Sequence, residues 1–410
     1  MKVAVFSKAF PVLSETFIIN QIIGLIELGG DVDIITNEAI KGSVMHSSIK
    51  ENDLMSRVIS LGLNSSYSKQ KKIYIAILNL IKLVGLLKFK EIFSILFDRY
   101  LFLGQKLNLL SAVKQLGITP LEYDNVICHF GDNAYYVYKM RSLGLFSGKI
   151  SVVFHGYEIS RHAIVNKYIK QYEQVFKFCE YLLPISELWR RKLIGFGCDP
   201  LKIKVHRMGI NIDDFNFFNI NRKFSKPLSI IQVGRLTEKK AILNSIKAVI
   251  HARNEIDLIF TVIGDGELFS EAKELIYNNN AESFIKLLGS QPQSVVKEYL
   301  KGTDIFLLPS VRASDGDMEG IPVALMEAMA SGLVVLSTYH SGIPELILDM
   351  ESGFLVEEGD IKSLADCIVR ISNLTDEQIA IIRKSARETC VEKYNNKLLN
   401  EEVYKLSLSV

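Results

Sequence analysis

Short apolar runs alternate with helical stretches along most of this chain. In the first part, a run at 3–7, a helical stretch near 15–28 and a second run at 32–36 make a strand–helix–strand unit, which implies two parallel strands. Three further runs continue the series, at 125–130, 149–155 and 181–186. This alternation predicts a doubly wound α/β domain, in which helices cover a parallel sheet.

A second series of the same kind fills the C-terminal half. Its runs lie at 228–236, 257–267, 284–289, 304–310, 333–338 and 353–358. The segment between the two series is polar, rich in turn-forming residues and closed by Pro227. For a chain of 410 residues, we predict an N-terminal, acceptor-binding Rossmann-like domain at 1–207, a linker at 208–227 and a donor-binding Rossmann-like domain at 228–385. The last helix, at 386–410, could pack back on the N-terminal domain.

Two doubly wound domains that face each other enclose a cleft, and clefts between domains are favoured ligand sites. A formal net charge of +2 argues against nucleic acid as a partner. The five cysteines are scattered without the spacing of a metal site or a redox motif. The chain begins with a strand rather than a signal peptide, and no apolar run reaches the ~18 residues of a membrane-spanning helix. We therefore predict a cytoplasmic protein with reduced cysteines.

Two glutamates, Glu319 and Glu327, flank a proline at the start of a predicted helix. The run at 304–310 has the pattern of a buried strand, and Pro322 suits the first helical position, where its missing N–H costs nothing. Carboxylates can bind hydroxyl groups, and the free N–H groups of a helix start attract negative charge. At the carboxyl edge of a parallel sheet, this arrangement fits a ligand with hydroxyls on both sides of a phosphate. Glutamates on a solvated helix are the alternative.

Two basic residues follow the first strand of the second series. Arg235 and Lys240 emerge at the same predicted sheet edge as the glutamate loop, where two cations could neutralise a diphosphate. A solvated basic turn at the surface is the alternative. Gly264 and Gly266 follow the next strand and are predicted to make a tight turn that lines the same cleft.

Taken together and in this order, these motifs resemble glycosyltransferase family 4, the retaining enzymes of the GT-B fold. In the second half the resemblance rests on GRLTEKK at 234–240, GDGE at 264–267, LPS at 308–310, EGIPVALMEAMASG at 319–332 and SGIPELI at 341–347. In the first half it extends through FPVLSETF at 10–17, FHGYE at 154–158 and HRMGIN at 206–211. These pieces are most similar to the branch that builds bacterial exopolysaccharides and surface polysaccharides, such as colanic acid glycosyltransferases.

The resemblance implies a nucleoside-diphosphate sugar as donor substrate, with no cofactor and no metal ion. Arg235 and Lys240 are implied to hold the donor diphosphate and to stabilise the leaving group. Glu319 is implied to lie close to the donor sugar, and Glu327 to bind the ribose hydroxyls. His155 is implied to reach the sugar from the opposite side of the cleft. The other implied donor-binding positions are Gly234, Gly264, Gly266, Gly320, Ile321, Pro322 and Val323.

The N-terminal side departs from the family pattern. The loop that follows the first strand lacks the double-glycine turn that many relatives use near the donor diphosphate. We predict that Ser14, Glu15 and Thr16 form an acceptor-side loop in its place, with Ser14 and Thr16 able to cap the next helix.

Three polar residues near strand ends allow two interpretations each. Asp317, in the acidic loop before Glu319, could contact sugar hydroxyls, although we favour a solvated loop. His129 could face the acceptor, but we favour an interior histidine with satisfied hydrogen bonds. His340 lies near the donor edge, and the same two interpretations apply to it.

The sequence therefore predicts a retaining, metal-independent hexosyltransferase. It would transfer a sugar from a nucleoside-diphosphate sugar to a hydroxyl of a lipid-linked saccharide in bacterial surface polysaccharide biosynthesis. Two alternatives stay open, because a fold does not fix a reaction. One is a nucleotide-sugar epimerase or phosphorylase on the same fold, and the other is a non-catalytic subunit of a polysaccharide assembly complex.

One segment, at 68–106, is both basic and apolar. It carries eight Lys or Arg residues against Glu91 and Asp98, and apolar residues recur in it at helical spacing, at Ile77, Ile81, Val84 and Leu87. Such helices can lie on an anionic bilayer, which would make the protein peripheral at the inner face of the cytoplasmic membrane. A core-packed helix pair with lysines that extend to solvent is the alternative.

Overall fold

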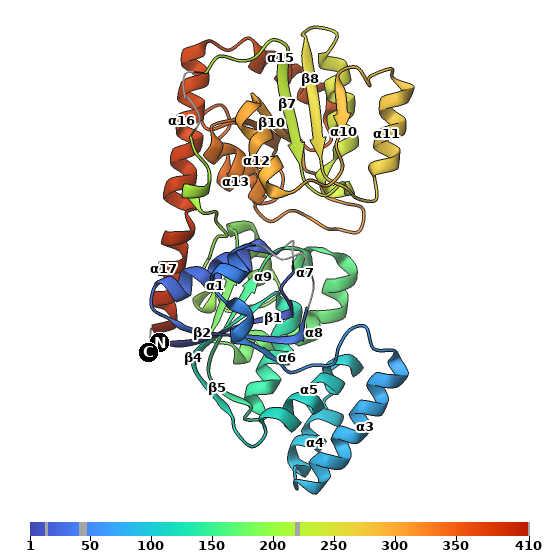
Figure 1. Cartoon of the computed structure of the whole chain (residues 1–410), viewed down its shortest axis with the longest axis vertical. Coiled ribbons are helices and arrows are strands. Elements are labelled where there is room, and N and C mark those ends of the chain that lie inside the picture. Colours follow the sequence, from blue (N-terminus) through green and yellow to red (C-terminus); the bar gives the residue numbers. More distant parts are fainter. Residues whose placement is uncertain (13–14, 41–46, 218–221, 409–410) are drawn as a thin grey trace.

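Two α/β domains are stacked end to end in the computed structural model, which describes residues 1–12, 15–40, 47–217 and 222–408 (Figure 1). Each domain has one six-stranded sheet with helices packed against it. The predicted fold class, two doubly wound domains that face a cleft, is confirmed. Each apolar run singled out in the sequence overlaps one strand of these sheets.

The N-terminal sheet has the strand order β3-β2-β1-β4-β5-β6, and all its pairs are parallel. Its strands are β1 Lys2–Phe10, β2 Asp31–Ala39, β3 Val58–Ser60, β4 Leu121–His129, β5 Phe146–Phe154 and β6 Tyr181–Pro184. The helices of this half are α1 Thr16–Glu27, α2 Ser47–Glu51, α3 Lys69–Gly85, α4 Phe89–Leu96, α5 Leu103–Leu116, α6 Gly131–Ser142, α7 Tyr157–Ser160, α8 His162–Phe178 and α9 Glu187–Gly195. The short edge strand β3 was not predicted, because its three residues are at most half-buried and form no apolar run.

The C-terminal sheet repeats this topology, with the order β12-β11-β10-β7-β8-β9 and parallel pairs throughout. Its strands are β7 Leu228–Val233, β8 Leu258–Ile263, β9 Ile285–Leu287, β10 Ile305–Leu308, β11 Val334–Thr338 and β12 Phe354–Val356. The helices that follow are α10 Ile242–Ala252, α11 Phe269–Asn278, α12 Gln293–Gly302, α13 Val323–Ser331, α14 Ile343–Leu346, α15 Ile361–Ser372, α16 Asp376–Lys393 and α17 Asn396–Leu408.

The C-terminal sheet is buried on both faces, which explains its continuous apolar runs. On β10, Ile305 and Leu307 pack in one core with residues of α10 and α15, whereas Phe306 and Leu308 pack in a second core with residues of α13 and α16. Successive side chains of a strand point to opposite faces, so one apolar run supplies both cores.

The strand order of each sheet reverses between its first and fourth strands, which are β1 and β4 in one domain and β7 and β10 in the other. Ligands of doubly wound sheets bind outside the carboxyl ends of the strands at such a reversal. The two carboxyl edges face each other, because Gly320, in the loop after β10, lies directly against the backbone oxygen of His155, which follows β5. The topology therefore brings both predicted half-sites to one cleft.

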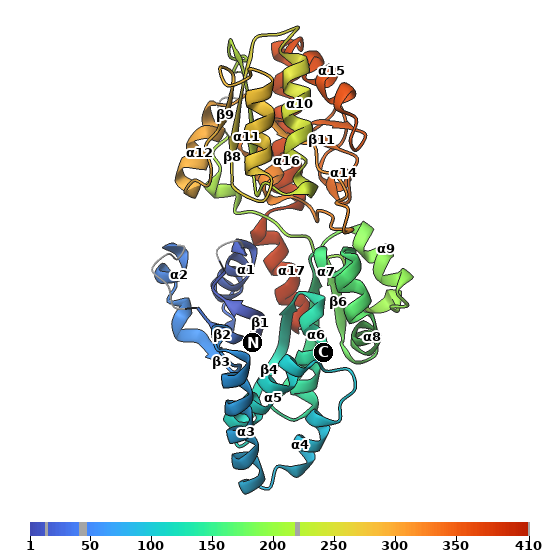
Figure 2. The same ribbon diagram turned by 90° about the vertical axis from the view of Figure 1, so that its right-hand side faces the viewer.

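The chain crosses between the domains twice. The first crossing follows β6 and passes Ile210, whose N–H donates to the backbone oxygen of Tyr394 at 2.9 Å. The second lies at residues 394–396, between α16, which packs on α13, and α17, which packs on α1 of the N-terminal domain. Figure 2 shows α17 beside α1, below the C-terminal domain. Two adjacent segments of the chain thus connect the domains.

Candidate active site in the interdomain cleft

The turns after β7 and β8 touch backbone to backbone. A Cβ on Gly264 would lie 1.8 Å from the backbone oxygen of Gly234, and one on Gly266 would lie 2.4 Å from that of Leu236. Gly234 and Gly264 also have φ of 149° and 146°, in a region open mainly to glycine. These glycines let the two loops pack together at the donor-side edge of the cleft.

Lys240 and Glu319 meet at this edge. Lys240 Nζ lies 2.9 Å from Glu319 Oε1, and the two side chains are only 16% and 8% exposed. Burial would raise the pKa of the Glu319 carboxyl, but the ammonium groups of Lys240 and Lys239 outweigh it and hold the pKa below its usual value. The loop after β10 therefore presents an ionised carboxylate together with a cation.

A buried histidine fixes the backbone of Glu319. The Glu319 N–H donates to His340 Nε2 at 3.1 Å, and His340 Nδ1 lies 2.7 Å from Glu358 Oε1. His340 therefore carries its proton on Nδ1 and accepts at Nε2, so both of its ring nitrogens are engaged. This geometry supports the interpretation of His340 as an interior histidine that positions the glutamate loop.

Arg235 stands apart from this pair. Its side chain is exposed and makes no ion pair with any residue that the structure describes. The cation is therefore available to an anionic ligand, whereas Lys240 is already engaged with Glu319.

The helix start at α13 differs slightly from prediction. α13 begins at Val323, and Pro322 is its N-cap with an extended ψ of 121°, so the prediction that Pro322 is the first helical residue is wrong by one position. The first N–H groups of the helix have no acceptor within it and form the positive end of its dipole. Ile321 is buried beneath this turn.

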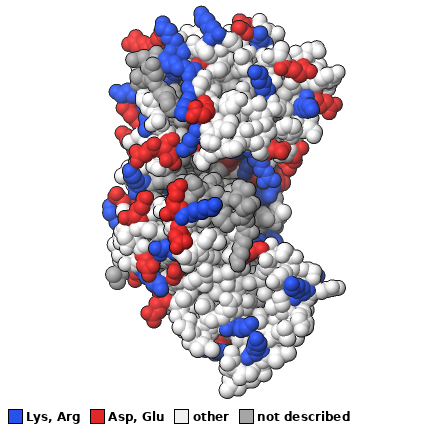
Figure 3. All heavy atoms as spheres, in the orientation of Figure 1, with Lys and Arg blue, Asp and Glu red and all other residues white. Residues whose placement is uncertain are grey.

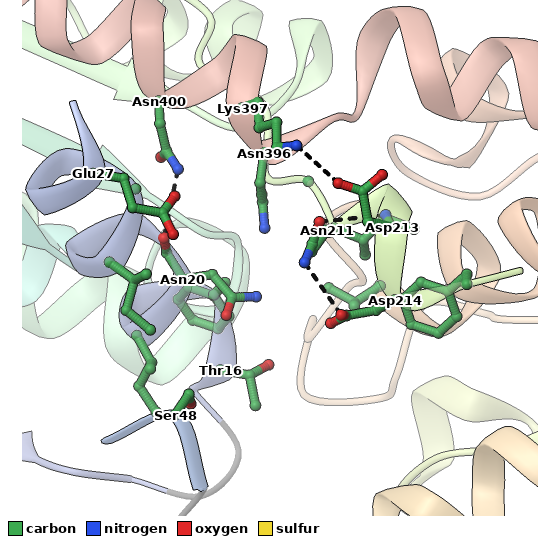
Figure 4. A pocket seen from close by; sticks show the side chains of 18 of the residues that line it. Thr16, Asn20, Glu27, Ser48, Asn211, Asp213, Asp214, Asn396, Lys397 and Asn400 are labelled. Carbon is green, nitrogen blue, oxygen red and sulfur yellow. Dashed lines mark hydrogen bonds and ion pairs between the residues drawn. The ribbon is translucent and has the colours of Figure 1, made fainter. Parts of the chain in front are cut away.

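Glu327 lines a cavity between the two domains. The cavity has a volume of ≈ 800 Å³ and lies between α12 and α13 on one side and α1 and α17 on the other. Figure 4 shows Thr16 and Asn20 on the N-terminal side, opposite Asn211 and Asp214. Burial raises the pKa of Glu327 to about 7, and the raising effect of Asp214 opposes the lowering effect of Lys297.

His155 is held firmly on the opposite side. Its Nε2 lies 3.0 Å from His129 Nδ1, and its ring centroid lies 4.7 Å from that of Phe17 and 4.4 Å from that of Phe130. The backbone N–H of His155 donates to Glu158 Oε1 at 2.6 Å. His129 is fully buried with both ring nitrogens hydrogen-bonded, as the interior interpretation predicted.

The acceptor-side loop is only partly described. Ser14 lies outside the described residues. Glu15, not Thr16, is the N-cap of α1, and its side chain makes no capping hydrogen bond, so the capping prediction is wrong for Thr16. The Glu15 carboxylate instead accepts from Ser7 Oγ at 3.4 Å, and burial raises its pKa to about 7. Thr16 lines the cavity with Glu327 and Val323.

The acidic loop before Glu319 contacts the N-terminal domain. Asp315 pairs with Arg161 of the N-terminal domain at 2.8 Å. Asp317 pairs with Lys239 at 3.2 Å, and its side chain is only 13% exposed. The preference for a solvated Asp317 was therefore wrong, because two cations that are distant in sequence surround it.

A further interdomain contact was not foreseen. The Glu345 carboxylate accepts from the backbone N–H of Glu187 at the start of α9, at 2.8 Å, and from Arg207 at 3.1 Å. An acidic side chain from one domain thus stabilises a helix start of the other. The only sequence signal was the position of Glu345 in the SGIPELI motif.

The structure therefore brings the site residues together in two groups. One group lies next to His155 and consists of Lys240, Glu319 and Gly320. The other group lines the cavity and consists of Thr16, Val323 and Glu327. Among the described residues, the Arg235 side chain forms no hydrogen bond or ion pair with either group. Among the described residues, no group of three or more His, Cys, Asp or Glu side chains could hold a metal ion.

Comparisons with known proteins agree with this architecture. Residues 213–389 match the family described as glycosyl transferases group 1. The chain is 41% identical over 377 residues to the amylovoran biosynthesis glycosyltransferase AmsK of Erwinia amylovora, with 91% of each chain covered. It is 36% identical over 407 residues to the putative colanic acid biosynthesis glycosyltransferase WcaL of Escherichia coli K12, with 99% of each covered.

Two more distant similarities concern ligands. The chain is 30% identical over 212 residues to an Escherichia coli UDP-Gal:alpha-D-GlcNAc-diphosphoundecaprenol alpha-1,3-galactosyltransferase, with 48% of this chain and 51% of that one covered. The crystal structure of Anabaena HepE in complex with UDP-glucose superposes with a TM-score of 0.70 at 15% identity, with 100% of both chains covered. At that identity the second similarity shows the fold alone.

Proposed function

Because this chain belongs to the group 1 glycosyltransferases, in the branch that serves exopolysaccharide biosynthesis, we propose that it transfers a sugar from a nucleoside-diphosphate sugar to a hydroxyl of a lipid-linked saccharide. We further propose that transfer retains the anomeric configuration and needs no metal ion. The observation that carries the proposal is the Lys240–Glu319 pair beside the start of α13, which faces His155 across the cleft.

In this proposal the donor diphosphate binds between the turn after β7 and the start of α13. Breaking the bond between sugar and diphosphate leaves growing negative charge on the leaving group, which preorganised cations and N–H dipoles stabilise. The exposed Arg235, the paired Lys240 and the first turn of α13 supply that positive charge without a metal ion. Each charge-assisted hydrogen bond contributes roughly 1.5 to 3 kcal/mol.

The two glutamates bind the two sugars of the donor. Glu327 lies four residues after Val323, the first residue of α13, so its Cα is ~6 Å along the helix axis from the phosphate-binding turn. There it accepts hydrogen bonds from ribose hydroxyls in the ≈ 800 Å³ cavity. Glu319, ionised by Lys240, accepts from hydroxyls of the transferred sugar, and His155 contacts that sugar from the N-terminal side.

The acceptor is proposed to enter from the N-terminal side, past the loop that precedes α1. A lipid-linked acceptor is supported by the partial similarity to the diphosphoundecaprenol-dependent galactosyltransferase. No helix in the described ranges is long and apolar enough to span a bilayer.

A membrane surface suits the far end of the N-terminal domain. α3 and α4 project from this domain away from the cleft (Figure 1). The apolar residues at helical spacing, Ile77, Ile81, Val84 and Leu87, are exposed rather than packed in the core. Ile81 is 63% exposed, Phe93 60% and Phe97 76%. The core-packed alternative accounts only for Ala76, Leu83, Ile92 and Ile95, which are buried.

Charge favours an anionic lipid surface over other occupants of this apolar face. The two acidic side chains of the segment are already neutralised, Glu91 by Lys88 at 3.2 Å and Asp98 by Lys139 at 2.8 Å. Figure 3 shows this end of the molecule as mostly uncharged, with a few basic side chains. An apolar face edged by lysines is the pattern of a peripheral membrane helix.

Flotation with phosphatidylglycerol liposomes at low salt tests the membrane proposal. The wild-type chain is expected to float with the vesicles. The double variant Phe93→Asp/Phe97→Asp is expected to stay at the bottom of the gradient. The control Tyr277→Asp replaces an equally exposed aromatic residue on α11 and is expected to float with the vesicles. A wild-type chain that does not bind at low salt contradicts this proposal.

Transfer is tested with UDP-, GDP- and ADP-sugars and a lipid-linked saccharide, and the new anomeric linkage is read by proton NMR. We expect acceptor-dependent turnover with retained configuration, which Arg235→Ala lowers by about 2 to 3 kcal/mol in transition-state stabilisation. A new sugar or sugar phosphate formed without acceptor would indicate the epimerase or phosphorylase alternative. Donor binding without turnover on any acceptor would indicate a non-catalytic subunit.

A further inference from the structure

A hydrogen-bonded chain of buried side chains leads away from His155. His155 Nε2 lies 3.0 Å from His129 Nδ1, His129 Nε2 lies 2.9 Å from Gln21 Oε1, and Gln21 Nε2 lies 3.1 Å from His206 Nε2. The four residues come from the ends of β5 and β4, from α1 and from the crossing segment after β6. The transfer reaction described above uses only the first of them.

The amide of Gln21 gives this chain a direction. Its oxygen can only accept, so His129 Nε2 carries a proton and His129 Nδ1 does not. His155 Nε2 must then donate to His129 Nδ1. At the other end, the Gln21 amide donates to His206 Nε2, so the proton of His206 sits on Nδ1. One glutamine thereby determines the proton position on three imidazole rings.

We propose that Gln21, His129 and His206 are positioning residues that fix His155 in its Nε2–H tautomer, so that His155 Nδ1 faces the cleft as a hydrogen-bond acceptor for a sugar hydroxyl. His155 Nδ1 has no hydrogen-bond partner among the described residues, whereas His155 Nε2 is hydrogen-bonded to His129. This inference rests on the proposed sugar transfer for the identity of the ligand. An acceptor nitrogen at this position selects a sugar that carries a hydroxyl there, because a hydroxyl can donate a hydrogen bond, over a sugar whose group there can only accept.

Burial keeps the chain neutral, as the argument requires. Burial lowers the pKa of His129 to about 3 and that of His206 to about 4. Burial also lowers the pKa of His155 well below its usual value, and its histidine neighbours add to the effect. A protonated His129 would donate from both ring nitrogens and would force the opposite tautomer on His155.

The ring of His155 is also held in place. Phe17 and Phe130 pack against it from α1 and from the turn after β4. Phe130 has a φ of 67°, a backbone conformation that residues other than glycine rarely adopt. The next residue must be glycine, since a Cβ on Gly131 would lie 2.0 Å from the ring of Phe154. Strain of this kind persists where the surrounding structure demands one geometry.

The test reads the tautomer directly, on the full-length chain labelled with ¹⁵N-histidine and without substrate. Long-range ¹H–¹⁵N spectra at pH 7.5 are expected to show His155 with its proton on Nε2. Gln21→Met keeps the side-chain length but cannot hydrogen-bond, and it is expected to give a mixture of His155 tautomers. Gln115→Met removes a glutamine of the same domain that bonds Leu61 and Ser111 instead, and it is expected to leave the His155 signals unchanged.

Kinetics supply the second readout. Gln21→Met is expected to lower kcat/KM for the sugar donor about tenfold, the effect of one weakened hydrogen bond, while the Kd of the sugar-free nucleoside diphosphate stays the same. A wild-type His155 with its proton on Nδ1 overturns the inference even if no variant folds. So does a Gln21→Met spectrum that matches wild type. The spectra need no turnover, so failure of the proposed reaction and failure of this inference are distinguishable.

Discussion

Removal of the charge of Glu327 should stabilise the free protein while it weakens donor binding. Burial raises the pKa of this carboxyl from 4.5 to about 7. Below pH ~4.5 the carboxyl is neutral in both the folded and the unfolded chain. Between the two pKa values only the folded chain keeps the proton, so the free energy of unfolding falls as the pH rises. Above pH ~7 the penalty is complete, because folding must then bury a charge.

The magnitude follows from the pKa difference. At about 1.4 kcal/mol per pH unit, a rise from 4.5 to about 7 corresponds to about 3 kcal/mol at most, since water in the cavity screens part of it. Glu327→Gln keeps the shape of the side chain without its charge. Its free energy of unfolding should therefore exceed that of wild type at pH 8, and the two should converge near pH 4.5.

Thermal unfolding of the two proteins from pH 4.5 to 8.5 measures this difference. For a domain of this size, about 3 kcal/mol corresponds to a Tm increase of roughly 6 to 12 °C at pH 8. A saturating nucleoside diphosphate should stabilise wild type more than Glu327→Gln, because the variant loses a charged partner for the ribose hydroxyls. A Tm difference that is independent of pH between 4.5 and 8.5 would refute the argument.

Three further outcomes are expected. Gly264→Ala should lower the Tm and weaken nucleotide binding, because its Cβ would lie 1.8 Å from the backbone oxygen of Gly234. Calorimetry measures both effects, and a variant as stable as wild type would contradict the close backbone contact. Lys240→Met should destabilise the fold by about 3 kcal/mol, since it leaves the buried Glu319 unpaired, and Lys240→Met with Glu319→Gln should recover most of that loss in denaturant titrations. Excess EDTA should leave the rate of sugar transfer unchanged if cations of the chain stabilise the leaving group, whereas a rate restored only by added Mg²⁺ or Mn²⁺ would refute metal independence.

The fold was predictable because its strands are buried on both faces. The run at 304–310, for example, contains β10, whose four residues are all buried. The strand–helix alternation then left few topologies besides a parallel sheet. β3 was not predicted from the sequence, because an edge strand of three partly exposed residues is too short to form a continuous apolar run.

The site was predictable only in part. Glu319 and Lys240 could be assigned to one sheet edge from the strands they follow, and the structure brings them into contact. The pairing of Asp315 with Arg161 depends on how the two domains meet, and so does the hydrogen bond from the start of α9 to Glu345; no local pattern encodes either contact. The link between Gln21 and His206 joins residues 185 positions apart. Such contacts require the complete topology.

The binding of a nucleoside diphosphate at the edge formed by β7 and β10 is the central claim. Calorimetric titration of UDP, GDP and ADP into wild type, Arg235→Ala and Arg191→Ala tests it most directly, because both arginines are exposed and their loss should not disturb the fold. We predict that at least one nucleotide binds wild type and Arg191→Ala alike, and binds Arg235→Ala roughly 10- to 100-fold more weakly. Equal affinity for all three proteins, or no binding of any nucleotide, would contradict the account.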